Sequence, residues 1–464
     1  MKQTPFDTIA AVSTPPGEGG IGIVRISGDD AQKIVLRIFH PYREKSRPTD
    51  KPSFSMTLGT IMDKGKIVDE VLVCVMKKPH TYTREDIVEI NCHGGAVAVN
   101  EVLRLVLESG ARLAEPGEFT QRAFTNGRID LAQAEAVLDI VRAKTHRALE
   151  AAVGQLEGRL SQKLCEFLDS LKQILTILEA NIDFAEEEAI TPLEYRMMKD
   201  KLGAVEREIS LLLESFETGK IYKDGVFTVI VGKPNVGKSS IMNAFLRFDR
   251  AIVTPIPGTT RDIIEEQLNI DGVPFILADT AGITDTENIV EKEGVNRSRN
   301  AMDRAGLLLV VFDSSSEIDE RDLEIARAAK KIPHVAVINK VDLESKNDPE
   351  RLVRKTGLDS SPVLLSAKNG TGLKELETRM LDMVRKGTAT GDYALMVTTR
   401  RHFESLRRAR EEIENALRAI CENREPELLA FDVKSAIDCI GEITGHVTNN
   451  EVLENIFNSF CIGK

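Results

Sequence analysis

The sequence lacks the features that mark membrane-spanning and secreted proteins. Its longest apolar run, Leu307 to Phe312, is far too short to cross a bilayer. Its first twelve residues include Pro5 and Asp7 and contain no apolar stretch of the kind that a secretory signal needs. We therefore expect a cytoplasmic protein without a membrane segment.

The sequence also lacks any C-x-x-C pair. Cysteines scattered over a long chain fit free thiols better than a disulfide framework. A metal site at Cys92 and His93 is excluded, because no second ligand pair has the spacing that a tetrahedral zinc site needs. We expect buried, free thiols at positions 74, 92, 165, 421, 439 and 461.

Length and charge limit the architecture and the partners. A chain of 464 residues suggests about three domains. The formal net charge of −12 disfavours a protein whose main affinity comes from a broad basic face, but it leaves room for a local basic patch.

The hydrophobic pattern changes along the chain. Residues 1–119 mix short β-rich runs (21–26, 68–75, 86–91) with a helix at 97–108, which predicts an α+β domain. Residues 117–191 contain no proline. Apolar residues recur about every 3.7 positions from Leu149 to Ile182, which predicts the long helices of a bundle.

Residues 216–384 differ from both neighbours. Short apolar strands alternate with helical stretches there, which predicts a parallel sheet covered on both faces. Helical periodicity returns at Arg400. We therefore expect a helical domain in two pieces, 120–215 and 385–464, interrupted by an inserted α/β domain. The expected strands of the inserted domain are 228–231, 274–278, 307–312, 335–338 and 362–365.

The inserted domain contains the phosphate-binding motif G-x-x-x-x-G-K-S at residues 232–239, between a strand and a helical stretch. Successive N–H groups of this loop and a helix N-terminus can cradle phosphates, Lys238 can reach the β- and γ-phosphates, and Ser239 can hold Mg²⁺. The residues of this motif expected to contact the nucleotide are Asn235, Val236, Gly237, Lys238, Ser239 and Ser240.

Three further motifs follow at strand ends, and the second of them selects GTP. Asp279-Thr280-Ala281-Gly282 places a carboxylate beside the Mg²⁺ and a glycine N–H near the γ-phosphate. In Asn339-Lys340-Val341-Asp342, the Asp342 carboxylate can accept from the N1–H and amino group of guanine, a donor pair that adenine lacks. Ser366-Ala367-Lys368 would pack over the base. We predict a GTPase in which Lys238 and Asp279 are catalytic, within a multidomain α/β fold: a P-loop G domain with a mostly parallel, doubly wound sheet, inserted into an all-α domain and preceded by an α+β domain.

The G domain resembles the potassium-stimulated, translation-factor-like GTPases in its P-loop and in Thr254 to Asp262. The resemblance implies a second Mg²⁺ ligand at Thr260 beside Ser239. It also implies a K⁺ site at Asn235, Thr254, Ile256 and Thr259, and nucleotide contacts from Thr254, Pro255, Ile256, Pro257, Gly258, Thr259 and Thr260. The alternative reading of this stretch is a flexible loop.

Ile283 follows the Asp279 motif where Ras-like enzymes have a water-orienting glutamine. An aliphatic side chain cannot polarise water, so another charge is needed, and K⁺ is a candidate because it supplies positive charge at the phosphates. Glu291 matches the water-orienting glutamate of the resembled group. The alternative reading of Glu291 is an exposed carboxylate at a helix start.

Motifs on both sides of the G domain resemble the MnmE (TrmE) family of tRNA modification GTPases over essentially the whole chain. They lie at residues 14–28, 82–89, 93–95, 116–124, 131–136 and 460–464. The resemblance implies an N-terminal domain that binds folate and forms a homodimer, and G domains whose K⁺-dependent dimerisation drives hydrolysis. It also implies that the chain acts with an FAD-containing partner, MnmG (GidA), in a heterotetramer. The two proteins would add an aminomethyl-type group to carbon 5 of the wobble uridine in certain tRNAs.

The resemblance implies contacts to 5-formyl-tetrahydrofolate at Arg25, Glu89, Arg128 and Lys464. A carboxylate such as Glu89 can read the amide and amino edge of a pterin, and the cations can pair with the glutamate tail of the folate. Lysine also occurs in the family at position 128, and arginine does not replace it freely. Cys461 matches a functional cysteine of the family, with a simple tail thiol as the alternative.

Two alternatives to this function stay open. One is a ribosome-assembly GTPase of the Era or EngA type, but the G-x-x-G at Gly17 to Gly20 lacks the basic context of a KH-type RNA-binding element. The other is a folate-dependent one-carbon transferase with a regulatory G domain.

A run of five arginines lies on a probable helix, at 400, 401, 407, 408 and 410. These arginines could contact a tRNA backbone or could form a solvated helix face.

Overall fold

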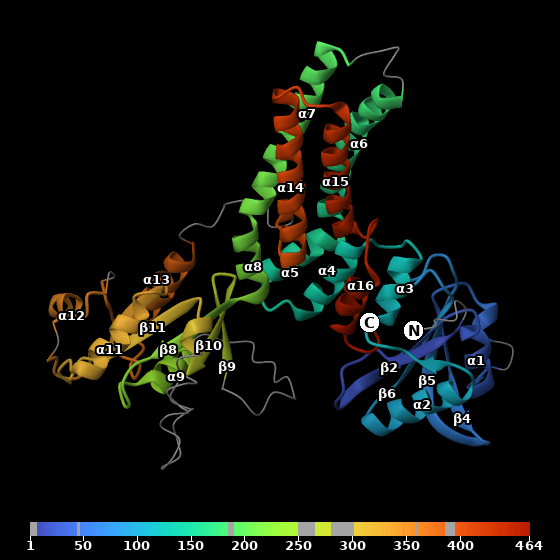
Figure 1. The fold of residues 1–464 in the computed structure, drawn as a ribbon. Coiled ribbons are helices and arrows are strands. Elements are labelled where there is room, and N and C mark those ends of the chain that lie inside the picture. Colours follow the sequence, from blue (N-terminus) through green and yellow to red (C-terminus); the bar gives the residue numbers. More distant parts are fainter. Residues whose placement is uncertain are drawn as a thin grey trace. The chain divides into compact units, whose positions relative to one another are not determined.

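The computed structural model describes residues 7–43, 47–183, 190–248, 265–279, 301–346, 348–358, 361–385 and 395–464. It shows a multidomain α/β fold that contains two separate sheets (Figure 1). The contacts divide the chain into two units. The first comprises Met1–Val141, Gln155–Gly203 and Arg408–Lys464, and the second comprises Arg142–Gly154 and Ala204–Arg407.

The first unit contains a seven-stranded sheet with the strand order β3-β4-β5-β6-β2-β1-β7. All neighbours are antiparallel except β1 and β7. The expected strands at 21–26, 68–75 and 86–91 are confirmed as parts of β2, β5 and β6. The strands are β1 (Ile9–Val12), β2 (Gly19–Ser27), β3 (Phe39–Pro41), β4 (Ser55–Asp63), β5 (Lys66–Met76), β6 (Ile87–Gly94) and β7 (Arg112–Leu113).

The two faces of this sheet are covered differently. Helices α1 (Ala31–Ile38) and α2 (Ala96–Glu108) bury one face in an aliphatic core. On the other face, Phe119 of α3 (Glu118–Thr125) packs on the β1 end against Ile9 and Ala11. The β4–β5 part of that second face carries exposed Met56, Leu58 and Leu72.

The leucine stripe forms helix core, but not as one continuous helix. Gly158, at φ +83°, separates α5 (His146–Leu156) from α6 (Arg159–Asp183). The stripe is buried in α6, which packs against α15 (Pro426–Thr444), whereas Leu149 and Val153 in α5 are more than a third exposed. The other helices with residues in the first unit are α4 (Leu131–Arg142), α7 (Pro192–Glu214), α14 (Arg400–Cys421) and α16 (Asn450–Asn458).

The second unit contains a six-stranded sheet with the order β13-β12-β11-β8-β10-β9. The five expected strands are confirmed as parallel β8 (Val226–Val231), β10 (Val273–Asp279), β11 (Leu307–Asp313), β12 (His334–Asn339) and β13 (Val363–Leu364). The sequence interpretation missed β9 (Glu265–Ile270), an antiparallel edge strand in which only alternate residues are buried. Buried apolar side chains cover both faces of the sheet. The helices are α8 (Phe216–Asp224), α9 (Lys238–Phe248), α11 (Glu320–Ala329), α12 (Pro349–Thr356) and α13 (Leu373–Arg385).

Two simpler expectations can be compared with this fold. None of the helices in the described ranges is long and apolar enough to cross a membrane. The six cysteines are free, but only Cys74, Cys92 and Cys439 are buried, so the expected burial is wrong for the exposed Cys165, Cys421 and Cys461. The domain boundaries at 119, 215 and 384 stay a prediction.

Candidate nucleotide-binding site

The P-loop connects the end of β8 to the start of α9 in the second unit. Two residues of the loop have a left-handed backbone, Asn235 at φ +65° and Gly237 at φ +97°. A Cβ on Gly237 would lie 2.3 Å from Nδ2 of Asn339, so a side chain there would displace the residue that holds the loop. The glycine therefore allows the NKxD motif to approach the P-loop backbone closely.

Lys238 is the buried cation of this loop. Its side chain is 7% exposed, and its Nζ donates to the carbonyls of Gly232 (3.1 Å) and Lys233 (2.9 Å). Burial lowers the pKa of Lys238, because desolvation penalises the ammonium form. A cation whose hydrogen bonds go to neutral carbonyls can exchange them for phosphate oxygens.

Ser239 and Asp279 converge beside Lys238. The Ser239 hydroxyl donates to Oδ2 of Asp279 at 2.5 Å, and Asp279 is buried at the carboxyl end of β10. A hydroxyl and a carboxylate are hard oxygen donors of the kind that Mg²⁺ takes. The donor set therefore fits the expected Mg²⁺ position, with Ser239 and Asp279 on the same side of the loop.

The base-recognition motifs meet at the carboxyl end of β12. Asn339, 1% exposed, donates from Nδ2 to the Val236 carbonyl (2.9 Å) and accepts at Oδ1 from the Ala367 N–H (3.1 Å). Asp342 accepts from the Ser366 hydroxyl at 2.7 Å, and this hydrogen bond lowers its pKa. The structure thus brings the P-loop, the NKxD motif and the Ser366 to Lys368 motif together.

Two supporting ion pairs escaped the sequence interpretation. Lys340 donates from Nζ to the Asn235 carbonyl (2.6 Å) and to Asp313 (2.7 Å), the last residue of β11. Burial alone would raise the pKa of Asp313, but the hydrogen bonds from Lys340 and Ser315 outweigh burial and lower it. An acidic residue at the end of an apolar strand is the signal that could have found Asp313.

The second ion pair fixes the start of the P-loop. Lys233 forms salt bridges with Asp319 (3.0 Å) and Asp322 (2.6 Å), the two residues of the capping box of α11. Burial alone would lower the pKa of Lys233, but the ion pairs with the two carboxylates outweigh burial, and the net effect is a raised pKa. The first turn of the P-loop is therefore tied to a helix N-terminus.

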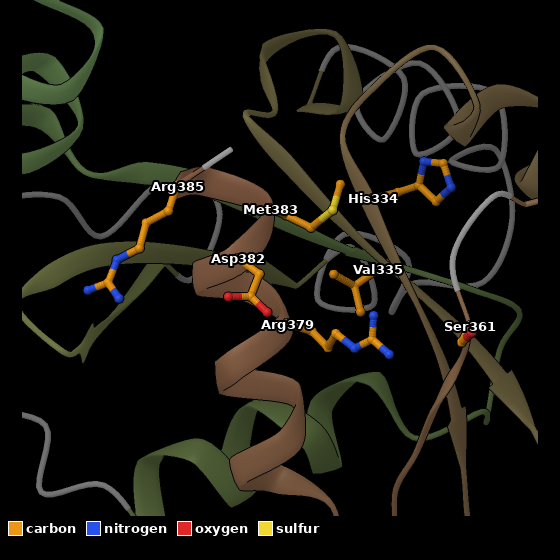
Figure 2. A pocket seen from close by; sticks show the side chains of 7 residues that line it. All are labelled: His334, Val335, Ser361, Arg379, Asp382, Met383 and Arg385. Atoms are coloured by element: carbon orange, nitrogen blue, oxygen red, sulfur yellow. The ribbon is translucent and has the colours of Figure 1, made fainter. Parts of the chain in front are cut away.

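The remaining predicted groups of this site fall outside the described residues. They are Thr254 to Thr260, Thr280 to Gly282, Ile283 and Glu291. A pocket of about 310 Å³ in the same unit lies at the opposite end of β12, at His334, whereas Asn339 ends the strand (Figure 2). It contains none of the predicted site residues. Its lining is His334, Val335, Ser361, Arg379, Asp382, Met383 and Arg385.

The residues implied to bind folate lie in the first unit, and three of them surround two aromatic rings. We call Arg25, Glu89, Phe119, Tyr82 and Arg128 the Arg25 cluster. Arg25 and Glu89 are opposite each other on β2 and β6 and form an ion pair at 2.8 Å. Arg25 lies 5.8 Å from the centre of the Phe119 ring, and Arg128 lies 4.7 Å from the centre of the Tyr82 ring. Tyr82 packs against the small buried core that contains Phe119, which joins the two halves of the cluster.

The segment that ends in Lys464 docks on the same unit. Ile462 forms an antiparallel bridge with Pro116, and the Ser13 hydroxyl donates to the Gly463 carbonyl at 3.3 Å. A Cβ on Gly463 would lie 2.2 Å from the Val12 carbonyl oxygen, so glycine permits this close approach. Cys461 is exposed, and its carbonyl accepts from the N–H groups of Gly117 and Lys464.

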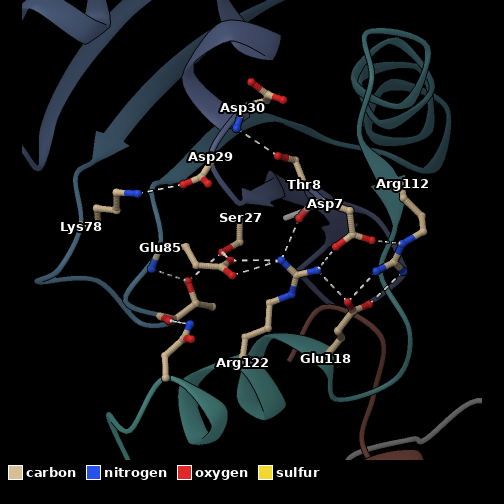
Figure 3. Close-up of polar contacts among 12 residues, drawn as sticks. Asp7, Thr8, Ser27, Asp29, Asp30, Lys78, Glu85, Arg112, Glu118 and Arg122 are labelled. Atoms are coloured by element: carbon tan, nitrogen blue, oxygen red, sulfur yellow. Dashed lines mark hydrogen bonds and ion pairs between the residues drawn. The ribbon is translucent and has the colours of Figure 1, made fainter. Parts of the chain in front are cut away.

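An ion-pair network holds α3 on the sheet next to the Arg25 cluster (Figure 3). Arg122 contacts Asp7 (2.7 Å), Glu85 (3.2 Å) and Glu118 (2.9 Å). Arg112 also bonds Asp7 and Glu118, each at 2.7 Å. Burial alone would raise the pKa of Glu118, but the two arginines outweigh it and lower the pKa. The network therefore fixes the loop that carries Tyr82.

The fold and the first site define a class. A mostly parallel sheet with a P-loop, a serine and an aspartate that could hold Mg²⁺, and an NKxD motif beside the P-loop define a GTP-binding P-loop hydrolase. The chain is therefore a GTPase.

Comparison with known proteins identifies the family. Residues 8–128 match the model described as "GTP-binding protein TrmE N-terminus", and residues 131–461 match "MnmE helical domain". The tRNA modification GTPase MnmE of Alkaliphilus oremlandii is 48% identical over 99% of both chains, and that of Clostridioides difficile is 44% identical over the same shares. A crystal structure of Aquifex aeolicus Era with GDP and AlF4− is 26% identical over 40% of this chain and 66% of that chain, with a TM-score of 0.29. The chain belongs to the MnmE (TrmE) family of tRNA modification GTPases. The ribosome-assembly alternative is not favoured.

Proposed function

We propose that this GTPase couples hydrolysis of GTP to modification of carbon 5 of the wobble uridine in certain tRNAs, together with an FAD-containing partner of the MnmG (GidA) type. The observation that supports this most is the match to relatives named tRNA modification GTPase MnmE over 99% of the chain. Because tRNA is the substrate, we propose the cytoplasm as the compartment.

Binding of the nucleotide would use groups already directed toward the P-loop. Lys238 would exchange the carbonyls of Gly232 and Lys233 for the β- and γ-phosphate oxygens. Ser239 and Asp279 would hold Mg²⁺ together with Thr260, and the ion supplies charge neutralisation at the phosphates. Asp342, fixed by Ser366, would accept from the N1–H and amino group of guanine.

Hydrolysis would depend on charges outside the Ras-like set. We propose that Glu291 orients the attacking water, since Ile283 cannot. Asn235, Thr254, Ile256 and Thr259 would hold K⁺, which supplies the positive charge that an arginine finger supplies elsewhere. The left-handed backbone of Asn235, held by Lys340 at its carbonyl, leaves the amide side chain of Asn235 exposed at the mouth of the loop.

Folate binding would use the Arg25 cluster. Both hydrogen bonds from Arg25 go to Oε1 of Glu89, so Oε2 can read the donor edge of a pterin. Arg128, held over Tyr82, and Lys464 would pair with the glutamate tail of a reduced folate such as 5-formyl-tetrahydrofolate. The donor set fits this ligand, since it presents a carboxylate, cations and aromatic faces on one side of the sheet.

We further propose that the chain forms a homodimer through its N-terminal domain, and a heterotetramer with its partner. The exposed row of Met56, Leu58 and Leu72 on the second face of the sheet supports the homodimer, because an apolar strip on an exposed sheet face is better buried than solvated. The G domains of two copies would then meet across the K⁺ sites in the GTP state.

The decisive experiment compares GTP hydrolysis by the full chain in matched KCl and NaCl buffers. We expect hydrolysis to be at least about tenfold faster in KCl, and Glu291→Ala to lower turnover by at least about tenfold while GTP binding is kept. Equal rates in the two salts would remove the K⁺ site. A wild-type turnover in the variant would remove Glu291 from the mechanism. Loss of the modified wobble uridine in cells that lack the chain tests the tRNA assignment separately.

A further inference from the structure

The loop between β3 and β4 and the end of β5 carry cations that, within the described part of the chain, form no ion pair with a carboxylate. We call Arg47, Lys51, Phe54 and Lys77 the Phe54 edge. Lys51 donates from Nζ to the Met56 carbonyl (3.3 Å), and Lys77 donates from Nζ to the Thr49 carbonyl (3.0 Å). Among the described residues, no carboxylate forms an ion pair with Arg47, Lys51 or Lys77, and Asp50 is the one acidic residue in 47–54. The edge is a local positive patch on an acidic chain.

The loop that carries these cations is well held. Pro48 is buried at the start of the short 3₁₀ helix Pro48–Asp50, and the Phe54 N–H donates to the Val75 carbonyl at 2.9 Å. The Lys77 N–H donates to the Ser53 hydroxyl at 2.9 Å, which ties the end of β5 to the loop. The backbone that carries the cations of the edge is therefore fixed by these contacts.

Phe54 itself is in a conformation that a bulky residue rarely adopts. Its φ is +67°, in the left-handed region that favours glycine or asparagine, and its side chain is 57% exposed. The ring is absent from the buried core of this sheet. A strained position that displays an aromatic ring to solvent gives the fold nothing that glycine would not give, so the ring has a use outside the fold.

The arginine-rich helix α14 differs in this respect. Arg400 and Arg407 both pair with Glu404, and Arg410 pairs with Glu414. Arg408 pairs with Glu442. These four arginines already form ion pairs, with three carboxylates between them, so α14 has the ion-paired, solvated face that was one of the two readings of its sequence. At the Phe54 edge, a phosphate backbone would compete with fewer carboxylates for the cations.

We infer that the Phe54 edge binds the RNA substrate, with an unpaired base stacked on Phe54 and the neighbouring phosphates held by Arg47, Lys51 and Lys77. An aromatic ring flanked by unpaired cations is how proteins hold single-stranded RNA loops. The inference rests on the proposed tRNA substrate. It assigns to the N-terminal domain a contact with RNA that is separate from the Arg25 cluster.

The first test removes the charges. Binding of the full chain to an unmodified tRNA transcript with uridine at the wobble position is measured between about 50 and about 200 mM salt. We expect Lys51→Gln/Lys77→Gln to reduce the salt slope by about 1.4 to 1.8, because each lost phosphate contact removes about 0.7 to 0.9. Lys64→Gln/Lys66→Gln is the matched control. It removes two charges from the β4–β5 turn, at the other end of the same hairpin, and should leave the slope unchanged.

The second test separates the ring from the fold. Phe54→Gly relieves the backbone strain, so a purely structural site predicts equal or higher thermal stability and unchanged RNA binding. We expect equal or higher stability with a loss of affinity of about tenfold. Phe54→Tyr, which keeps a ring, should restore binding. KM for GTP should be unchanged in all these variants.

Each outcome decides the inference. Wild-type RNA affinity and salt slope in Lys51→Gln/Lys77→Gln and in Phe54→Gly would overturn it, while the proposed function would stand on the hydrolysis and modification assays. Variants that lose RNA binding only because the dimer dissociates, as judged by light scattering, would also overturn it, since the edge would then be a contact between copies. A wild-type chain that binds no RNA at about 50 mM salt overturns it as well.

Discussion

The nucleotide site and the Arg25 cluster hold their charged groups in different ways. In the nucleotide site, Lys238 is held by neutral carbonyls and Ser239 by Asp279, so a ligand exchanges one hydrogen bond for another. In the Arg25 cluster, Arg25 is already neutralised by Glu89 and Arg128 lies on an aromatic face. A ligand there binds groups that keep their existing partners, so each group contributes less to its affinity. A single substitution should therefore reduce ligand affinity less in the cluster than in the P-loop.

The largest expected effect comes from the buried cation. Lys238→Met removes the positive charge at the β- and γ-phosphates, and we expect kcat/KM for GTP to fall by about 10²- to 10³-fold. Lys374→Met, at an exposed position of α13, is the matched control. A fall of less than tenfold would show that the P-loop tolerates substitution as well as the Arg25 cluster, and the contrast would be lost.

Substitution of Asp342 tests whether base recognition also depends on the exchange of a protein hydrogen bond for one to the ligand. Asp342→Asn replaces an acceptor-only carboxylate by an amide, which leaves the guanine N1–H and amino group without their paired acceptor. We expect GTP affinity to fall by about a hundredfold and affinity for xanthosine triphosphate, which has an oxygen in place of the amino group, to rise. Competition between the two nucleotides measures this, and an unchanged preference would contradict the assignment.

The Arg25 cluster should show smaller changes. We expect Glu89→Gln to weaken binding of 5-formyl-tetrahydrofolate by about tenfold, because the pterin loses a charged acceptor. Tyr82→Leu, which removes the ring under Arg128, should weaken it by about two- to fivefold. Tyr42→Leu, an exposed tyrosine of the same domain, is the control in equilibrium titration. Loss of all binding in Tyr82→Leu would show that the cluster is as intolerant as the P-loop.

The smallest effect concerns stability and pH. The pKa of Asp313 is lowered in the fold, so the pair with Lys340 stabilises the protein above the ordinary pKa of about 3.9 and loses this contribution as pH falls through the lowered value. We expect Asp313→Asn to cost about 1 kcal/mol at neutral pH and nothing at pH values well below the folded pKa. Thermal unfolding of both proteins across acid pH checks this, with the exposed Asp382→Asn as control. A difference that stays constant with pH would rule out the pair as its cause.

The nucleotide site could be predicted because each of its motifs is contiguous in sequence. Parallel strands bring their carboxyl ends to one edge, so four short motifs were enough to place Asn339 and Ala367 beside the P-loop. The pairs of Lys233 with Asp322 and Lys340 with Asp313 join residues far apart in the sequence, and no local pattern encodes them. Strand β9 was missed for a related reason, because an edge strand buries only alternate residues.

In the N-terminal domain the sequence motifs indicated the residues but not their arrangement. The family resemblance named Arg25 and Glu89, whereas their pairing follows from the β2–β6 register, which the sequence does not specify. Tyr82 and Phe119 lie within the motifs at 82–89 and 116–124, but their contacts with Arg128 and Arg25 depend on how α3 packs. The positive φ of Phe54 had no signal at all, since the residue type there argues against that conformation.

The docking of Gly463 beside β1 has a consequence for synthesis. The Ser13 hydroxyl and the Gly463 carbonyl that accepts its hydrogen bond are separated by 450 positions. At about 5 to 20 residues per second, a ribosome needs about 20 to 90 s to pass from one to the other. During that time Ser13, at the end of β1, lacks this hydrogen bond. The segment around Gly463 can dock on the sheet only after the helices and the G domain have been translated. The sheet that contains β1 is thus translated before the G domain but completed only after it.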